Sequence, residues 1–155
     1  MSDGPPTPEL AVLVGLPGAG KTSFFRHRFG ATHVHVSKDL MKNLRDRNAR
    51  QLRQIDEALR EGRSAAVDNI NPTPEDRAPL VAAARARGAR VVAYVIEATV
   101  REAVGRNRGR EGDARVPDVA IFLAAKRLQA PTREEGFDAI YRVRAVEGRF
   151  DVEPW

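Results

Sequence analysis

The sequence contains no cysteine, and aromatic residues make up only 6% of its 155 positions. Without cysteine the chain has no disulfide, no thiolate zinc site and no thiol nucleophile. No apolar run approaches the ~20 residues that cross a membrane, and residues 1–8 lack the basic and apolar regions of a secretory signal. We therefore expect a cytoplasmic, intracellular protein without a membrane partner or a disulfide partner.

Lysine is scarce as well. Arginine and lysine together number 26 against 21 acidic residues, for a net charge of +5, and only four of the 26 are lysines. A basic balance attracts polyanions without sequence preference. Three of the lysines, Lys21, Lys38 and Lys42, fall near one predicted site. The length and the 42% hydrophobic content predict one domain over residues 9–155, preceded by a flexible Pro-rich tail over residues 1–8.

Short apolar runs alternate with amphipathic segments along the chain. The run at residues 10–14 ends at Gly15 and is typical of a strand buried on both faces. A stripe of apolar residues predicts one long helix over residues 39–60. Its members are Met41, Leu44, Leu52, Ile55 and Leu59.

The same patterns predict the remaining elements. The alternation of strands and helices is typical of an α/β domain, with about five parallel strands, right-handed crossovers and flanking helices. Further strands are predicted at residues 34–36, 64–67, 90–96 and 139–143, with an extra edge strand at 150–155. Further helices are predicted at 21–29, 74–88, 100–108 and 117–128.

Residues 15–22 match the phosphate-loop pattern G-x-x-x-x-G-K-[ST], between a predicted strand and a predicted helix. Glycines permit positive φ, so successive backbone N–H groups can point at phosphate oxygens, and the helix N-terminus adds its dipole. Lys21 is predicted to bridge the β- and γ-phosphates of ATP, and the Thr22 hydroxyl to hold Mg²⁺. The predicted ATP-binding residues of this loop are Gly15, Pro17, Gly18, Ala19, Gly20, Lys21, Thr22 and Ser23.

The second predicted strand leads into Ser37-Lys-Asp-Leu-Met-Lys42, at the edge where parallel sheets bind their ligands. Asp39 and Lys42 are three residues apart at a predicted helix start and so share a face. A carboxylate there can accept the proton of an attacking hydroxyl as general base, and the cation beside it can hold an acceptor phosphate. Alternatively, Asp39 simply caps the helix.

Two further segments carry charged candidates. The third predicted strand runs into Asp68 and Asn69, where Asp68 can reach Mg²⁺ through water or can begin an Asx turn. Arg106 and Arg110 are four apart in a glycine-rich segment, so both can face the same way in a mobile lid. One guanidinium can stack on adenine and the other can neutralise transition-state charge. A solvated basic face is the alternative interpretation.

Five segments, in order, resemble the kinase domain of polynucleotide kinase, including the kinase half of the polynucleotide kinase/phosphatases. The phosphate loop is shared with many enzymes, whereas the four later segments are more specific together. The five segments are Val14–Thr22, which contains the phosphate loop, and then Val34–Asp39, Val67–Pro72, Arg106–Arg110 and Ala130–Phe137.

This resemblance implies a P-loop kinase fold with an Arg-rich lid, and transfer of the ATP γ-phosphoryl group to a 5′-hydroxyl end of DNA or RNA. It implies that Lys21, Asp39 and Arg110 are catalytic, with Asp39 as the base. Arg106 is then nearer adenine than Arg110. No D-x-D-x-T segment is present, so a companion 3′-phosphatase activity is not expected. The implied acceptor-side residues are Asp39, Lys42, Asp68 and Asn69.

Two other functions are compatible with parts of this pattern. A small-molecule P-loop kinase acting on a sugar or antibiotic hydroxyl would share the phosphate loop, the base and the lid. A non-catalytic, nucleotide-dependent nucleic-acid-binding module would share the loop and the basic charge. Asp39 argues against the second, because binding of a polyanion gains nothing from a carboxylate at that position.

Overall fold

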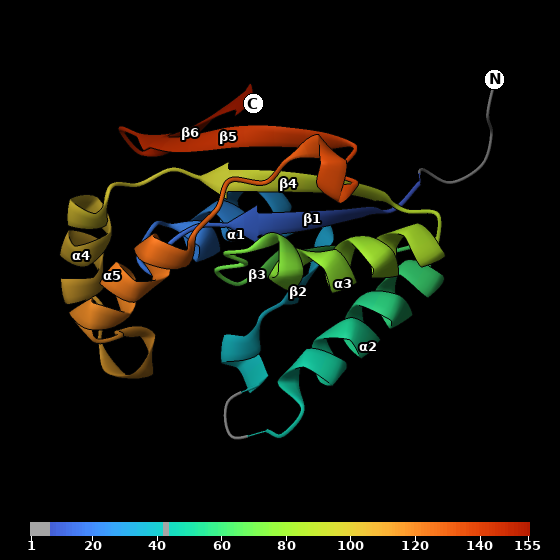
Figure 1. The fold of residues 1–155 in the computed structure, drawn as a ribbon, viewed down its shortest axis with the longest axis horizontal. Coiled ribbons are helices and arrows are strands. Elements are labelled where there is room, and N and C mark those ends of the chain that lie inside the picture. Colours follow the sequence, from blue (N-terminus) through green and yellow to red (C-terminus); the bar gives the residue numbers. More distant parts are fainter. Residues whose placement is uncertain (1–6, 42–43) are drawn as a thin grey trace.

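The computed structural model describes residues 7–41 and 44–155 (Figure 1). Most of the predicted tail over residues 1–8 lies outside the described residues, as does Lys42, the predicted acceptor cation. Within the described ranges, no helix combines the length and the apolar character that a membrane crossing requires.

The described chain forms a six-stranded sheet in the order β2-β3-β1-β4-β5-β6 (Figure 1). The pairings from β2 to β5 are parallel, whereas β6 runs antiparallel to β5. The predicted five-stranded parallel sheet and its extra edge strand are therefore confirmed. The strands are β1 (Glu9–Val14), β2 (His33–Val36), β3 (Ser64–Asp68), β4 (Arg90–Ile96), β5 (Ala139–Val146) and β6 (Arg149–Pro154).

Helices cover both faces of the sheet and supply two separate apolar cores. One core is formed with α2 and α3, and the other with α1, α4 and α5. Short 3₁₀ turns, η1, η2 and η3, lie in three of the connections. The helices are α1 (Lys21–Phe29), α2 (Arg47–Arg60), α3 (Pro74–Ala86), α4 (Val100–Arg108) and α5 (Asp118–Arg127), and the 3₁₀ turns are η1 (Lys38–Met41), η2 (Gly112–Ala114) and η3 (Arg133–Glu135).

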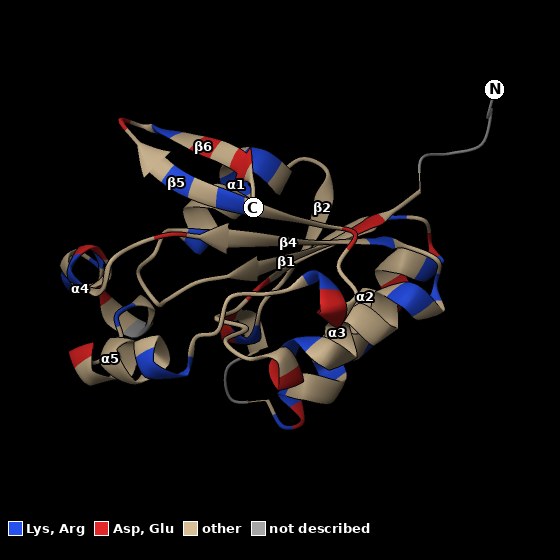
Figure 2. Ribbon diagram, turned by 45° about the horizontal axis from the view of Figure 1, so that its top comes forward, with Lys and Arg blue, Asp and Glu red and all other residues tan. Residues whose placement is uncertain are grey.

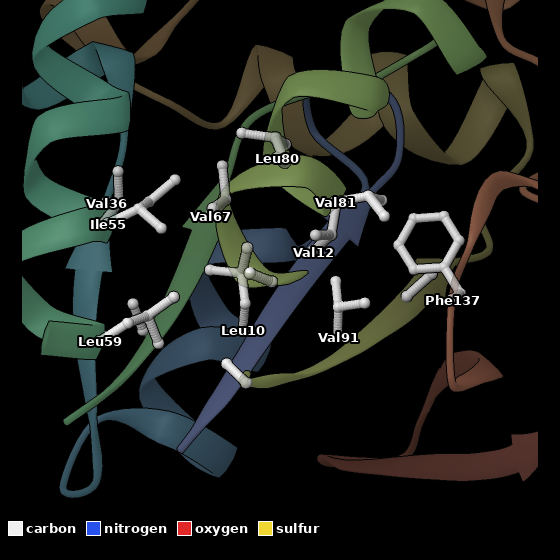
Figure 3. Packing of buried hydrophobic residues seen from close by; sticks show 14 of the residues in the cluster. Leu10, Val12, Val36, Ile55, Leu59, Val67, Leu80, Val81, Val91 and Phe137 are labelled. Atoms are coloured by element: carbon white, nitrogen blue, oxygen red, sulfur yellow. The ribbon is translucent and has the colours of Figure 1, made fainter. Parts of the chain in front are cut away.

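The central strand β1 contributes to both cores. Leu10 and Val12 pack with α2 and α3, as Figure 3 shows, whereas Ala11 and Leu13 face the opposite core. All four side chains are fully buried. Because successive side chains of a strand alternate between faces, the continuous apolar run of this segment is what a strand covered on both faces requires. Its carboxyl end leads directly into the phosphate loop.

The predicted long helix over residues 39–60 is wrong. Lys38–Met41 forms only the short turn η1, and α2 begins at Arg47, after Asp46 with a left-handed φ of 53°. The backbone N–H of Lys38 donates to Asn69 Oδ1 at 2.9 Å, which ties η1 to the end of β3. Leu44, assigned to the apolar stripe, is 47% exposed. The helical spacing of apolar residues across this break is therefore coincidental. Sequence periodicity cannot reveal the hydrogen bond between Lys38 and Asn69, which holds η1 against the end of β3.

The fully buried guanidinium of Arg77 holds together the segment after β3 and the segment that follows α5. Arg77 on α3 donates to both carboxylate oxygens of Glu135, at 2.8 and 3.1 Å, and to the carbonyl oxygens of Asn71 and Gln129, at 2.9 and 3.0 Å. Burial would raise the pKa of Glu135, but the Arg77 hydrogen bonds and charge outweigh it and hold that pKa below 4.5. The pair therefore stabilises the fold above pH 4.5, and this stabilisation is lost as the pH falls through the lowered pKa.

We expect Arg77→Leu to lower the free energy of unfolding by about 3–5 kcal/mol, because it leaves a carboxylate and two carbonyls without their donor in a buried place. Urea unfolding at pH 7 measures the effect. The matched control is Arg87→Leu, which breaks the exposed pair with Asp56 and should leave the unfolding midpoint close to that of the unmodified protein. Equal effects of the two substitutions would contradict the structural role of Arg77.

Candidate functional site

The phosphate loop has the backbone that its glycines predict. Gly18 and Gly20 have φ values of 81° and 104°, in the left-handed region where a side chain is strained. A Cβ atom on Gly18 would also collide with the carbonyl oxygen of Ala103 on α4. Only glycine fits at this position, and α4 therefore packs directly against the loop. The first turn of α1 begins at Lys21 and presents its N-terminus to the same place.

Lys21 lies inside the loop rather than in solvent. Its Nζ atom donates to the carbonyl oxygens of Gly15 and Leu16 at 2.9 and 2.8 Å, and the residue is buried. The pKa of Lys21 is lowered from 10.5 to about 8, because burial and, to a smaller extent, the Arg110 charge outweigh the opposing charges of Asp68 and Asp39. A desolvated ammonium with few partners gains strongly from an arriving phosphate, which is the electrostatic preparation that phosphoryl transfer needs.

Asp68 joins the loop to the sheet. Its Oδ2 atom accepts a hydrogen bond from the Thr22 hydroxyl at 2.7 Å and contacts His35 Nε2 at 2.9 Å. Burial would raise the pKa of Asp68, but the bonds from His35 and Thr22 and the Lys21 charge lower it below 3.8. The predicted alternative, an Asx turn, does not describe these contacts.

The oxygens of Thr22 and Asp68 are suited to Mg²⁺. A hydroxyl and an ionised carboxylate are the hard ligands that this ion prefers, and it commonly takes its other ligands from phosphates and water. No cluster of three or more His, Cys, Asp or Glu side chains able to hold a metal occurs in the described part of the chain. A metal here would therefore depend on the triphosphate for the rest of its coordination.

His35 is a site residue that the sequence reasoning missed. It lies on β2, contacts Asp68 and stacks on Phe25, with ring centroids 4.0 Å apart and an interplanar angle of 17°. The stacked ring fixes the direction in which the imidazole meets the carboxylate. The alternation of β2 places both His33 and His35 on the face of β3 that carries Asp68, and His35 is the one nearer to that carboxylate along the strand.

Three of the four acceptor-side candidates, Asp39, Asp68 and Asn69, line one cavity of about 500 Å³, and the fourth, Lys42, lies outside the described residues. Asp39 is exposed at its wall, and Lys21, Thr22, Asp68 and Arg110 line the same space. The structure therefore brings the predicted base and the predicted phosphate-loop residues together. Because α2 begins only at Arg47, Asp39 does not cap the long helix that the sequence suggested.

Asn69 lines the cavity, and both ends of its side-chain amide also bond within the protein. Its Oδ1 atom accepts the Lys38 N–H, and its Nδ2 atom donates to Gln51 Oε1 at 2.5 Å. Gln51 is buried on α2. Both ends of the Asn69 amide are thus engaged within the protein, where they hold the backbone next to Asp39 against α2. Nothing in the sequence singled out Gln51, because it lies within an amphipathic helix and belongs to no recognised motif.

Arg106 and Arg110 do not share a helical face. The helix α4 ends at Arg108, so the four-residue spacing does not apply to Arg110. Arg106 Nη1 donates to the carbonyl oxygen of Ala19 at 2.7 Å and holds the phosphate loop. Arg110 lines the cavity, with Nη1 at 3.3 Å from the carbonyl oxygen of Ala114. The helical spacing that suggested a common direction is therefore absent, and the two roles expected of these arginines stay predictions.

Comparison with known proteins identifies the family and relatives of this chain. The AAA domain family AAA_33 matches residues 10–131. A curated relative from Schizosaccharomyces pombe, named "Bifunctional polynucleotide phosphatase/kinase", is 27% identical over 139 residues, which are 87% of this chain and 33% of that protein. A relative from Acanthamoeba polyphaga mimivirus is 29% identical over 142 residues, with the same two coverages. The chain thus spans about a third of the length of the curated relatives it matches.

Solved structures share the fold at lower identity. Chaetomium thermophilum Kti12, solved with ADP-AlF₃, gives a TM-score of 0.67 at 16% identity and covers 87% of this chain and 88% of its own. A gluconokinase from Sinorhizobium meliloti gives a TM-score of 0.59 at 18% identity, with coverages of 91% and 85%. These likenesses confirm the predicted P-loop kinase fold.

We expect the binding of a nucleoside triphosphate to take up a proton at Lys21. With a free pKa of about 8, about half of the Lys21 side chains are uncharged at pH 8, and phosphate oxygens favour the charged form. Affinity should therefore be constant below pH 8 and fall as the pH rises above it. Calorimetry at pH 8 in two buffers of different protonation enthalpy measures the uptake. Lys21→Arg, charged throughout, is the control, and identical enthalpies for the unmodified protein would contradict the lowered pKa.

We expect His35→Ala to raise the Mg²⁺ concentration needed for half-maximal nucleotide binding by about tenfold or more, because an outer partner that orients a ligating carboxylate is typically worth ~10–100-fold in metal affinity. His35→Gln, which keeps a side-chain donor, should restore part of this loss. Titration of Mg²⁺ at fixed nucleotide, followed by fluorescence of a labelled nucleotide, gives the value. An unchanged Mg²⁺ requirement would show that the His35 contact serves only packing against Phe25.

Proposed function

Because this chain belongs to the AAA domain family AAA_33 and has the fold and phosphate loop of a kinase-type P-loop enzyme, we propose that it is an ATP-dependent polynucleotide 5′-kinase. It transfers the γ-phosphoryl group of ATP to the 5′-hydroxyl of a DNA or RNA end. The observation that carries the proposal is that Lys21, Arg110 and Asp39 line the same cavity. The name of the Schizosaccharomyces pombe relative supports the acceptor class.

The residues divide the reaction among them. Asp39 accepts the proton of the 5′-hydroxyl as its oxygen bonds to the γ-phosphorus, and the bond from that phosphorus to the β,γ-bridging oxygen breaks to release ADP. Lys21 and Arg110 neutralise charge that spreads over the phosphoryl oxygens and the leaving group. Mg²⁺, when bound through Thr22 and Asp68, supplies further charge neutralisation at the phosphates. Asn69 holds the Lys38 backbone and so positions Asp39.

One observation favours a small neutral acceptor instead. Glu75 and Asp76, at the start of α3, also line the cavity, and carboxylates repel a phosphate-bearing acceptor. The fold of the gluconokinase is compatible with this second candidate, a small-molecule kinase for a sugar or antibiotic hydroxyl. Asp76 is engaged by Thr73 and, at 3.4 Å, by Arg127. The Arg127 guanidinium offsets the charge of Asp76, and the names of the two curated relatives favour the polynucleotide acceptor over the small neutral one.

The deciding experiment measures ADP release with a panel of acceptors. A single-stranded oligonucleotide with a 5′-hydroxyl should be phosphorylated, whereas its 5′-phosphorylated counterpart and a set of sugars and amino alcohols should not. Asp39→Asn should then reduce kcat by about 10²–10⁴-fold, because general-base removal typically costs that much. Its melting temperature should stay unchanged, since the Asp39 side chain is exposed and α2 begins beyond it.

Asp46→Asn is the matched control for Asp39→Asn. Asp46 is an exposed acidic residue of the same connection, and asparagine tolerates its left-handed backbone. This variant should keep near-normal kcat. Phosphorylation of a sugar in preference to the oligonucleotide would overturn the polynucleotide assignment, and normal turnover by Asp39→Asn would overturn the role of the base.

A further inference from the structure

A buried amide closes the connection that carries Arg110. The side chain of Asn107, near the end of α4, is fully buried. Its Nδ2 atom donates to the carbonyl oxygen of Val116 at 2.7 Å, and its Oδ1 atom accepts from the backbone N–H of the same residue at 2.9 Å. We call this pair of hydrogen bonds the Asn107 clamp. It joins the end of α4 to the far end of the connection that leads into α5, and Figure 1 shows these two helices side by side.

The segment that the clamp closes forms part of the cavity wall. Arg110, Ala114 and Val116 all line the cavity. The Arg110 N–H donates to the Asn107 carbonyl oxygen at 3.0 Å, and Arg110 Nη1 donates to the Ala114 carbonyl oxygen at 3.3 Å. Both bonds are local, so they shape the turn without fixing its far end. The clamp fixes that end, because Asn107 belongs to a helix whose Ala103 is packed in the core.

Position distinguishes Arg110 from the other basic residues nearby. Figure 2 shows basic residues on α4 and at the end of α5, on either side of the connection. Arg108 donates to Asp118 at 3.2 Å and is exposed, whereas Arg110 is half-buried and lines the cavity. The Arg110 charge also contributes to the lowered pKa of Lys21. In the free protein, Arg110 therefore already lies near the lysine of the phosphate loop.

We propose that Asn107 is a positioning residue for phosphoryl transfer: the Asn107 clamp holds the connection against the cavity so that the Arg110 guanidinium meets the γ-phosphoryl group. This inference rests on the kinase function proposed above, in which Arg110 neutralises transition-state charge. Asn107 acts through Arg110 and not on the reacting atoms, because its side chain is buried and both ends of its amide bind Val116. Misplacement of a catalytic group by about 1 Å can cost ~10²-fold in rate.

The clamp requires the chemistry of an amide. A carboxamide presents an acceptor oxygen beside an N–H donor, so it can match the N–H and the C=O of one backbone residue at once. Without it, the two backbone groups of half-buried Val116 lose their partners, and the connection gains freedom at its far end. The expected defect is therefore a loss of order around Arg110. The phosphate loop and Asp39 lie on other elements and keep their places.

A double-mutant cycle on Asn107 and Arg110 tests the inference, with kcat and KM measured on the oligonucleotide that carries a 5′-hydroxyl. Asn107→Ala should lower kcat by about 10–10²-fold, as expected for a misplaced catalytic group, and leave the KM for the acceptor close to that of the unmodified protein. In the Arg110→Ala background the same substitution should lower kcat no further, because Asn107 acts through Arg110. Arg108→Ala breaks the exposed contact with Asp118 beside the clamp; it is the matched control and should keep normal kcat.

A second variant keeps the test valid if Asn107→Ala fails to fold. Asn107→Asp retains the size of the side chain and the acceptor for the Val116 N–H, but an ionised carboxylate cannot donate to the Val116 carbonyl oxygen. Relative to the unmodified protein at the same pH, its kcat should be reduced and should recover as the pH falls, because a protonated carboxyl regains the donor. A lower melting temperature with unchanged kcat per folded molecule would instead show that Asn107 serves the fold alone, and would overturn the inference.

Failure of the inference and failure of the proposed function give different results. If the losses in kcat of Asn107→Ala and Arg110→Ala multiply in the double variant, Asn107 acts independently of Arg110, and the inference falls while the kinase proposal stands. If a sugar is phosphorylated and the oligonucleotide is not, the polynucleotide assignment falls. The same cycle measured with that sugar then decides the role of Asn107, because Arg110 acts on the γ-phosphoryl group whichever hydroxyl attacks it.

Discussion

The hydrogen bond between the Thr22 hydroxyl and Asp68 Oδ2 is the contact on which the rest of the site depends. It joins the first turn of α1 to the carboxyl end of β3, and the same oxygen meets His35 from β2. Three segments distant in sequence thus converge on one buried carboxylate. Because a buried charge is tolerated only when it is fully partnered, Thr22, His35 and the Lys21 charge together keep Asp68 ionised at the position where a metal–nucleotide complex would lie.

Polar side chains at the same edge of the sheet perform a comparable task for the connections. The Asn69 amide forms hydrogen bonds with the Lys38 backbone and with Gln51. The buried Arg77 guanidinium donates to Glu135 and to loop carbonyls. These groups can hardly serve as ligands for a substrate without releasing the backbone that they hold. Their contribution to chemistry is geometric: they fix where Asp39 and the cavity wall lie, which matters because a small displacement of a reacting group is costly in rate.

The helix α4 and the phosphate loop are held in direct contact. Gly18 lets α4 approach the loop, and Arg106 donates to the Ala19 carbonyl. A movement of α4 would therefore move the loop that holds the phosphates, and it would carry Arg110 with it. Arg110 is also one of the charges that lower the pKa of Lys21. Two cations held close together in the free protein repel each other, and a bound triphosphate relieves that repulsion.

The sequence by itself determined the parts that depend on local pattern. Residues 15–22 and the apolar run before them specify the phosphate loop, and the alternation of strands and helices specifies the parallel sheet, because both follow from backbone geometry and burial. Only the tertiary structure revealed the break between η1 and α2, the hydrogen bonds of Asn69, the bond from Arg106 to the phosphate loop, and the contact of His35 with Asp68. Each of these is decided by a hydrogen bond or stacking contact between residues far apart in sequence, and such contacts leave no periodic trace along the chain.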